Sequence, residues 1–318
     1  MDKTLLAITA LLLVPIVLVA YIVLVEWVLR RFSQKSADKL RPVLWIFPAG
    51  TLLFVFLVYP AIATVFRSFF DRDGGAFIGL GNYVRFFTDS ETIIALINNV
   101  LWVLLWPLIA VGVGLIIAVL VDRVRYETVV KSVVFLPMAI SFVAASVIWS
   151  MVYDINPNIG VLNAAVTGLG GEPVAWLINW PLNTIMLIMV GVWMLTGFAM
   201  VILSAGLKGI STELLEAARV DGANEWQVFR NVTFPLLLPT VAVVATTVII
   251  FALKTFDVVY TMTGGQFDTE VIANRMLKEL IPFREPGRAA ATATILFLAI
   301  VPIMIVNIRR FREQEAIR

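Results

Sequence analysis

Side chains that could catalyse a reaction are scarce in this sequence. Its 318 residues include no cysteine and no histidine. This composition excludes disulfides, thiolate nucleophiles and imidazole bases, together with most zinc and haem sites. A phosphate-binding loop of the form G-x-x-x-x-G-K-[ST] is also missing, because no glycine is followed by a lysine. We therefore expect no catalytic residue, no metal site and no cofactor bound by this chain itself.

A compact group of polar and small residues stands between 206 and 235, in the stretch GLKGISTELLEAARVDGANEWQVFRNVTFP. Ser211 or Thr212 can cap a helix here, and Gly222 permits a left-handed turn at its end. A second short helix is expected from about Asn224. It should expose three apolar side chains: Trp226, Val228 and Phe229. Two helices that are too small to form a core, with apolar groups on their surface, predict docking to a partner.

The rest of the sequence places this loop beside a membrane. Hydrophobic residues make up 60% of the chain and charged residues 14%, whereas a soluble domain is about half apolar and about a quarter charged. A helix needs about 20 apolar residues to cross a bilayer. Seven stretches qualify: 4–29, 43–69, 98–121, 132–153, 182–205, 236–256 and 289–308. We expect an all-α integral membrane protein with about seven transmembrane helices. The net charge of +2 is too small to indicate binding to nucleic acid.

Lysine and arginine residues decide the orientation, because short cytoplasmic loops collect them. They cluster between the first two predicted spans, at 122–131, at 206–234 and in the C-terminal tail, whereas 154–181 contains neither. This pattern predicts an external N-terminus and a cytoplasmic C-terminus. We divide the chain into residues 1–42, an extra N-terminal transmembrane helix with a basic cytoplasmic linker, and residues 43–318, a transmembrane domain that contains the 206–235 loop.

One predicted external loop, 271–288, disagrees with the charge rule. Apolar residues recur in it near helical spacing, which predicts a short amphipathic helix. Its basic residues alternate with glutamates, and we expect these charges either to form a solvated surface or to dock a partner. The basic residues are Arg275, Lys278, Arg284 and Arg288.

The residues of the 206–235 loop resemble the EAA loop of bacterial ABC importer permeases. The family pattern is EAA, then a glycine, then I-x-L-P about ten residues later. This chain has Glu216-Ala217-Ala218, Gly222 and Val232-Thr233-Phe234-Pro235. The resemblance implies the type I importer permease fold, a six-helix core to which the 4–29 helix is additional. We call residues 206–235 the EAA loop.

The resemblance also implies that the EAA loop forms a coupling helix in a cleft of an ATPase subunit. Small alanines allow close docking, the glutamate can hold a cationic or amide partner, and the glycine sets the angle between the two helices. The residues expected to make this contact are Glu216, Ala217, Ala218, Asp221, Gly222, Ala223 and Phe229.

Two further stretches are similar to the carbohydrate branch of these permeases. One is Trp193 with Ala205-Gly206-Leu207, and the other is TFDVVYTMTGG at 255–265. The continuation at Gln266-Phe267 resembles permeases of α-glucoside systems. The implied assembly contains a second permease in a heterodimer, two subunits that bind ATP and Mg, and an extracytoplasmic solute-binding protein. It would import a sugar across the lipid of a bacterial or archaeal cytoplasmic membrane, and this chain would be a non-catalytic subunit.

The substrate path is expected near the midplane of the membrane, where transporters bind their solutes. Counting about ten residues inward from each end of the EAA loop, at about 1.5 Å per residue, reaches the neighbourhoods of residues 195 and 249. Aromatic rings there can stack on sugars, although packing between helices explains the same pattern. The candidates are Gly191, Leu195, Phe198, Thr247, Val248 and Phe251.

Other functional classes stay open at this point. An ion-coupled secondary carrier commonly places acidic or basic residues at membrane depth, and a membrane-embedded enzyme needs titratable groups that face a cavity. The second to seventh predicted spans lack such residues away from their ends. Neither class explains the EAA pattern. An ABC permease for a non-sugar solute, such as a polyol, glycerol phosphate or peptide, is the nearer alternative.

Overall fold

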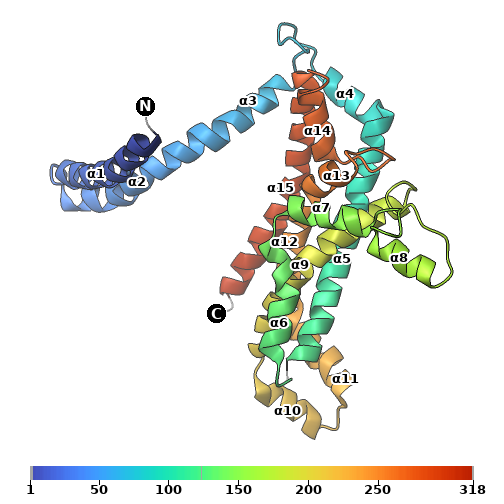
Figure 1. Cartoon of the computed structure of the whole chain (residues 1–318). Helices are drawn as coiled ribbons and strands as arrows, with labels where there is room; N and C mark the ends of the chain where they lie inside the picture. Colours follow the sequence, from blue (N-terminus) through green and yellow to red (C-terminus); the bar gives the residue numbers. More distant parts are fainter. Residues whose placement is uncertain (1–2, 123, 317–318) are drawn as a thin grey trace. The chain divides into compact units, whose positions relative to one another are not determined.

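A computed structural model describes residues 3–122 and 124–316 (Figure 1). These residues form helices and loops, and the sole β-type pairing among them is an isolated bridge between Phe70 and Phe77. The chain divides into two compact units, Met1–Thr64 and Val65–Arg318. We describe each unit by itself.

The N-terminal unit consists of long apolar helices. Helix α1 (Lys3–Leu29) is followed by α2 (Gln34–Leu53) and a π-helical turn η1 (Phe54–Val58), from which α3 (Tyr59–Arg67) continues. Val25 and Leu29 of α1 pack against Ala37 of α2. Because α2 begins at Gln34, most of the predicted linker that ends at residue 42 is helical.

The second unit is built around two long helices, α5 (Ser90–Val121) and α9 (Leu182–Lys208), which lie side by side (Figure 1). Trp102 and Trp106 of α5 and Leu195 and Met200 of α9 are buried in the main hydrophobic core. Gly191 makes the close approach possible, because a Cβ at this position would lie 2.7 Å from Cε2 of Trp106. Helices α12 (Phe234–Leu253) and α15 (Pro286–Ala316) complete the bundle.

The predicted span 132–153 is not one continuous helix. It consists of α6 (Glu127–Phe135), a 3₁₀ turn η2 (Leu136–Ala139) and α7 (Phe142–Val152), with a bend of 100°. Pro137 lies in the turn, where its missing N–H and its ring disfavour a continuous α-helix. Ser141 then starts the new helix, because its Oγ accepts a hydrogen bond from the Ala144 amide at 3.1 Å.

Five helices in the described part of the chain are long and apolar enough to cross a membrane, and a sixth results if the bent pair α6–α7 counts as one span. One of these five helices is Gln34–Arg67, which stays helical although it contains prolines. The predicted first span is helical as α1, but the apolar part found there, Pro15–Leu29, is shorter than the others. A seventh span therefore stays a prediction.

Short helices occupy the two ends of the second unit (Figure 1). Helices α10 (Thr212–Val220) and α11 (Glu225–Val228) lie at one end, which we call the EAA end. Helices α4 (Gly81–Thr88) and α14 (Ile272–Leu280) lie at the opposite end, which we call the far end. Helices α8 (Val161–Gly168) and α13 (Asp257–Met262) flank the bundle between them.

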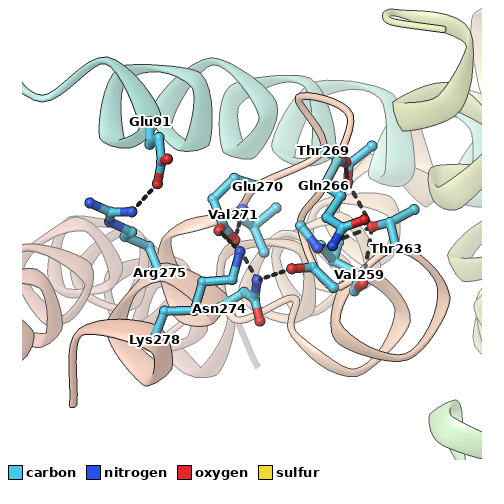
Figure 2. A network of polar contacts seen from close by, with 12 residues as sticks. Glu91, Val259, Thr263, Gln266, Thr269, Glu270, Val271, Asn274, Arg275 and Lys278 are labelled. Carbon is cyan, nitrogen blue, oxygen red and sulfur yellow. Dashed lines mark hydrogen bonds and ion pairs between the residues drawn. The ribbon is translucent and has the colours of Figure 1, made fainter. Parts of the chain in front are cut away.

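Two of the basic residues that disagreed with the charge rule, Arg275 and Lys278, lie on α14, and Figure 2 shows Arg275 beside Glu91 and Lys278 beside Glu270. The Arg275 side chain is 5% exposed and forms ion pairs with Asp89, at 2.6 Å, and with Glu91. Glu279 is 3% exposed, and burial raises the pKa of its carboxyl above the ordinary value. We expected these charges to form a solvated surface or to dock a partner. Both expectations are wrong for Arg275 and Glu279, because the two side chains are buried and pair with charged residues of this chain.

Buried asparagines from the long helices hold the segment before α14. Nδ2 of Asn98 donates to the carbonyls of Asp268 and Glu270, at 2.7 and 2.9 Å, and Nδ2 of Asn183 donates to that of Phe267 at 2.6 Å. Phe267 and Asp268 both have φ near +57°, in the left-handed region. The asparagines thus fix a strained turn at the far end.

Candidate functional site

The EAA loop has the two-helix shape that its sequence predicts. Helix α10 ends at Val220, and Gly222 adopts a φ of +87° in the turn that follows. Ser211 stands at the N-cap of α10, but its side chain makes no capping hydrogen bond. Asn224 caps the next helix, α11, with two hydrogen bonds. Its Oδ1 accepts from the backbone N–H of Gln227 at 2.9 Å, and its backbone N–H donates to Oε1 of Gln227 at 2.8 Å. The turn is therefore fixed from the α11 side.

The second helix of the EAA loop does not end before the next span. Helix α11 passes through a π-helical turn η3 (Phe229–Thr233) into α12, and residues Glu225–Leu253 form one helical segment of 29 residues. Pro235 sits in the first turn of α12, where a missing N–H is tolerated because the π turn precedes it. A displacement of α11 is thus passed directly to a membrane-spanning helix.

An ion pair closes the two short helices on each other. Nε of Arg219 on α10 lies 2.7 Å from Oε1 of Glu225 on α11. The hydrogen bond to Glu225 raises the pKa of the Arg219 guanidinium above its ordinary value. Behind the pair lies a cavity of about 250 Å³ between the ends of α5 and α9 and the EAA loop, lined among others by Asp122, Leu207 and Phe229.

The residues expected to contact an ATPase subunit form an outward-facing surface. Four of the seven are exposed: Glu216, Ala217, Asp221 and Gly222. The remaining three are half-buried: Ala218, Ala223 and Phe229. Trp226 is 66% exposed and stacks on Phe229, with ring centroids 5.8 Å apart. Val228, which was expected to be exposed, is only 3% exposed because it faces the cavity.

Most of the expected substrate-path residues pack inside the bundle. Leu195 and Val248 are buried in the core, and Phe198 is packed against it. The Thr247 hydroxyl donates to the Val243 carbonyl of its own helix at 3.0 Å. Phe251, which is 40% exposed, is the candidate that lines a cavity.

This second cavity has a volume of about 220 Å³ and lies where α12 ends and α7 begins. Three further rings and three polar or charged residues line it with Phe251: Trp106, Phe142, Phe256, Lys254, Thr255 and Asp257. Nε1 of Trp106 is buried and has no hydrogen-bond partner in the described part of the chain. The cavity therefore combines the exposed ring of Phe251 with the charged side chains of Lys254 and Asp257, as a ligand with both apolar and hydroxyl groups would require.

Sequence reasoning identified one wall of this cavity and missed the others. Phe142 reaches it because the α6–α7 break turns the chain there, and the signal for the break was Pro137 followed by Ser141. Lys254 lies at the end of the predicted span 236–256 and Asp257 just past it, so neither counted as a residue at membrane depth. In the described residues no group of three or more acidic side chains is arranged to hold a metal ion.

The fold and the EAA loop define a class of protein, the membrane subunit of a solute importer. Residues 110–312 match the family described as "Binding-protein-dependent transport system inner membrane component". The chain belongs to this family of ABC importer permeases, and it is a multi-pass inner-membrane protein.

Two relatives match over most of their length. The chain is 52% identical to the osmoprotective compounds uptake permease protein GgtC of Synechocystis sp. over 279 residues, covering 86% of this chain and 100% of that protein. It is 44% identical to the alpha-glucoside transport system permease protein AglF of Rhizobium meliloti over 290 residues, covering 89% and 86%.

A solved structure confirms the fold. The chain is similar to a chain in the crystal structure of a bacterial ABC transporter involved in the import of the acidic polysaccharide alginate, with a TM-score of 0.75 at 23% identity. The match covers 87% of this chain and 98% of the other. The expected type I importer permease fold is therefore correct.

Proposed function

We propose that this permease forms half of the translocation path of a sugar importer, with an α-glucoside as its substrate. The observation that supports this most directly is the 44% identity to an alpha-glucoside permease along 89% of the chain. The second cavity supports it independently. The ring of Phe251 in its wall, which is 40% exposed, can stack on the apolar face of a pyranose, and Lys254 and Asp257 can bind hydroxyl groups.

The partners follow from the same proposal. The EAA loop lies in the cytoplasm and its exposed surface, Glu216–Gly222 with Trp226, docks in a cleft of an ATPase subunit that binds ATP and Mg. A second permease completes the path, and an extracytoplasmic binding protein delivers the solute at the far end. Charge placement supports this orientation, because basic residues cluster in the EAA loop and its neighbours and are missing from 154–181.

Transport by the purified complex tests the substrate. The chain is co-expressed with the neighbouring transport genes, and the complex is reconstituted in proteoliposomes with its binding protein. We expect uptake of methyl α-glucoside that depends on ATP and on the binding protein, and much weaker uptake of methyl β-glucoside. Equal uptake of both anomers, or of neither, contradicts an α-glucoside substrate.

Import of an osmoprotective compound is a second candidate, because the chain is 52% identical to a permease of that description. Thermal stabilisation of the binding protein separates the two. An α-glucoside importer predicts that glucosides raise the Tm of the binding protein, whereas uncharged or zwitterionic osmolytes that contain no sugar do not.

A further inference from the structure

An ion cluster joins α6 to the end of α9, where α9 runs into the EAA loop. A single carboxylate oxygen, Oε1 of Glu127, contacts the ammonium groups of both Lys131 and Lys208, the latter at 2.7 Å. Glu127 and Lys131 lie on α6, and Lys208 is the last residue of α9. Lys131 also donates to Oγ of Ser204, which is buried on α9. The two helices are thus held together by polar contacts over more than one helical turn.

A close backbone approach holds the same two helices at the other end of α6. A Cβ on Gly197 of α9 would lie 2.7 Å from Cα of Phe135, the last residue of α6. Helix α6 is therefore in contact with α9 at its beginning, through Glu127, and at its end, through Gly197. The 3₁₀ turn η2 follows at once, and after it Phe142 lines the second cavity.

We propose that Glu127 is a positioning residue that makes α6 and α9 move as one unit. A displacement of the EAA loop then reaches the α6–α7 break and the wall of the cavity at Phe142. This inference rests on the proposed function, in which the EAA loop receives the movement and the cavity takes the solute. Helix α9 ends at Lys208, within the EAA loop, so the cluster lies at the junction of α9 with this loop.

The charges explain why this one carboxylate matters. Lys131 and Lys208 both contact the same oxygen, so their ammonium groups lie near each other and repel. Removing the negative charge of Glu127 leaves the two lysines facing each other across the α6–α9 contact. It also removes the ion pair between Glu127 and Lys208, so that the bond from Lys131 to Ser204 remains between the helices. Asp122 also acts on Lys208, but it does not contact Lys131.

Substitution of Glu127 tests the proposal in the reconstituted complex. With Glu127→Gln we expect normal assembly and ATP hydrolysis, and a fall in solute transported per ATP of about fivefold, the size typical of a lost coupling contact. The double variant Glu127→Lys with Lys208→Glu keeps one carboxylate among two lysines and should restore the ratio. Glu172→Gln, at an exposed position outside the cluster, is the matched control. A wild-type ratio in Glu127→Gln, or no rescue by the exchange, overturns the proposal.

A distance measurement tests the same idea without any solute. Because the chain has no cysteine, spin labels can be attached through Val129→Cys on α6 and Ile202→Cys on α9, both exposed positions. The distance between the labels should be the same with and without ATP in the otherwise native complex, and should change with ATP when Glu127→Gln is added. A nucleotide-dependent distance with Glu127 intact overturns the proposal. Failure of the proposed function is distinct, because the complex with the native Glu127 would then transport no glucoside.

Discussion

Gly222 is the residue on which the shape of the EAA loop depends most directly. Its φ of +87° lies in the left-handed region, and no atom outside its own neighbourhood lies within 4 Å of the place where a Cβ would stand. Substitution there changes the backbone rather than the packing. A residue other than glycine costs about 1–3 kcal/mol in such a conformation, and asparagine tolerates it best.

A pair of substitutions at Gly222 tests the role of the turn. Proline requires a φ near −65°, so Gly222→Pro should reorient α10 and abolish the stimulation of ATP hydrolysis by loaded binding protein. Gly222→Asn should keep most of that stimulation. Both are measured as ATPase activity of the reconstituted complex, with assembly checked by gel filtration. An assembled Gly222→Pro complex with full stimulation would remove the EAA loop from the coupling path.

Substitutions of two phenylalanines distinguish the role of the second cavity from that of the core, because Phe251 lines the cavity and Phe198 packs on the core. Phe251→Ala removes a ring from the cavity wall and should raise the KM for uptake by about two- to tenfold, the range of one lost aromatic contact. Phe198→Ala removes a ring of similar size that packs on the core, so it should lower the Tm of the complex and leave the KM unchanged. If both variants had the same KM as the wild type, the cavity would not be the solute site.

At the scale of elements, α14 depends on buried charge rather than on an apolar face alone. Arg275 is surrounded by Asp89, Glu91 and Glu279, and Thr292 donates to Oε2 of Glu279 at 2.7 Å. Without this cation, Glu279, which is 3% exposed, keeps Arg288 at 3.6 Å as its remaining basic partner. The arginine therefore fixes α14 on the N-terminal end of α5.

Arg275→Met should destabilise the far end by about 3 kcal/mol, the cost of breaking a buried ion pair. We expect a lower Tm of the purified complex and faster proteolysis between α13 and α15. Arg284→Met, at an exposed arginine in the same segment, is the control and should behave like the wild type. Equal stability of the two variants would show that α14 is held by its apolar contacts.

The elements that the sequence predicted well are those that depend on local composition. Apolar stretches located the long helices, and the glycine after the EAA triplet located the turn. The α6–α7 break was missed because hydropathy does not distinguish a straight span from one bent at Pro137. The inward direction of Arg275 was missed because its partner Asp89 is 186 residues away in the sequence, and a charge pattern does not reveal such a contact.

At the scale of the whole second unit, polar contacts gather at the two ends and apolar packing fills the length between them. The EAA end contains the Glu127 cluster and the Arg219–Glu225 pair, and the far end contains the asparagines and the ion pairs of α14. The second cavity lies between these ends, near the last turn of α12. The cavity could not be predicted as a whole, because its walls come from α5, α7, α12 and the start of α13.

The continuous helix from Glu225 to Leu253 has a geometric consequence. Its 29 residues make a rod about 40 Å long, so a tilt of about 10° about its EAA end moves the other end by about 7 Å. That end carries Phe251 and Lys254 into the wall of a cavity of about 220 Å³, which is only about 6 Å across if taken as a cube. A rotation of about 10° at the EAA end therefore displaces one wall of the second cavity by about the width of that cavity.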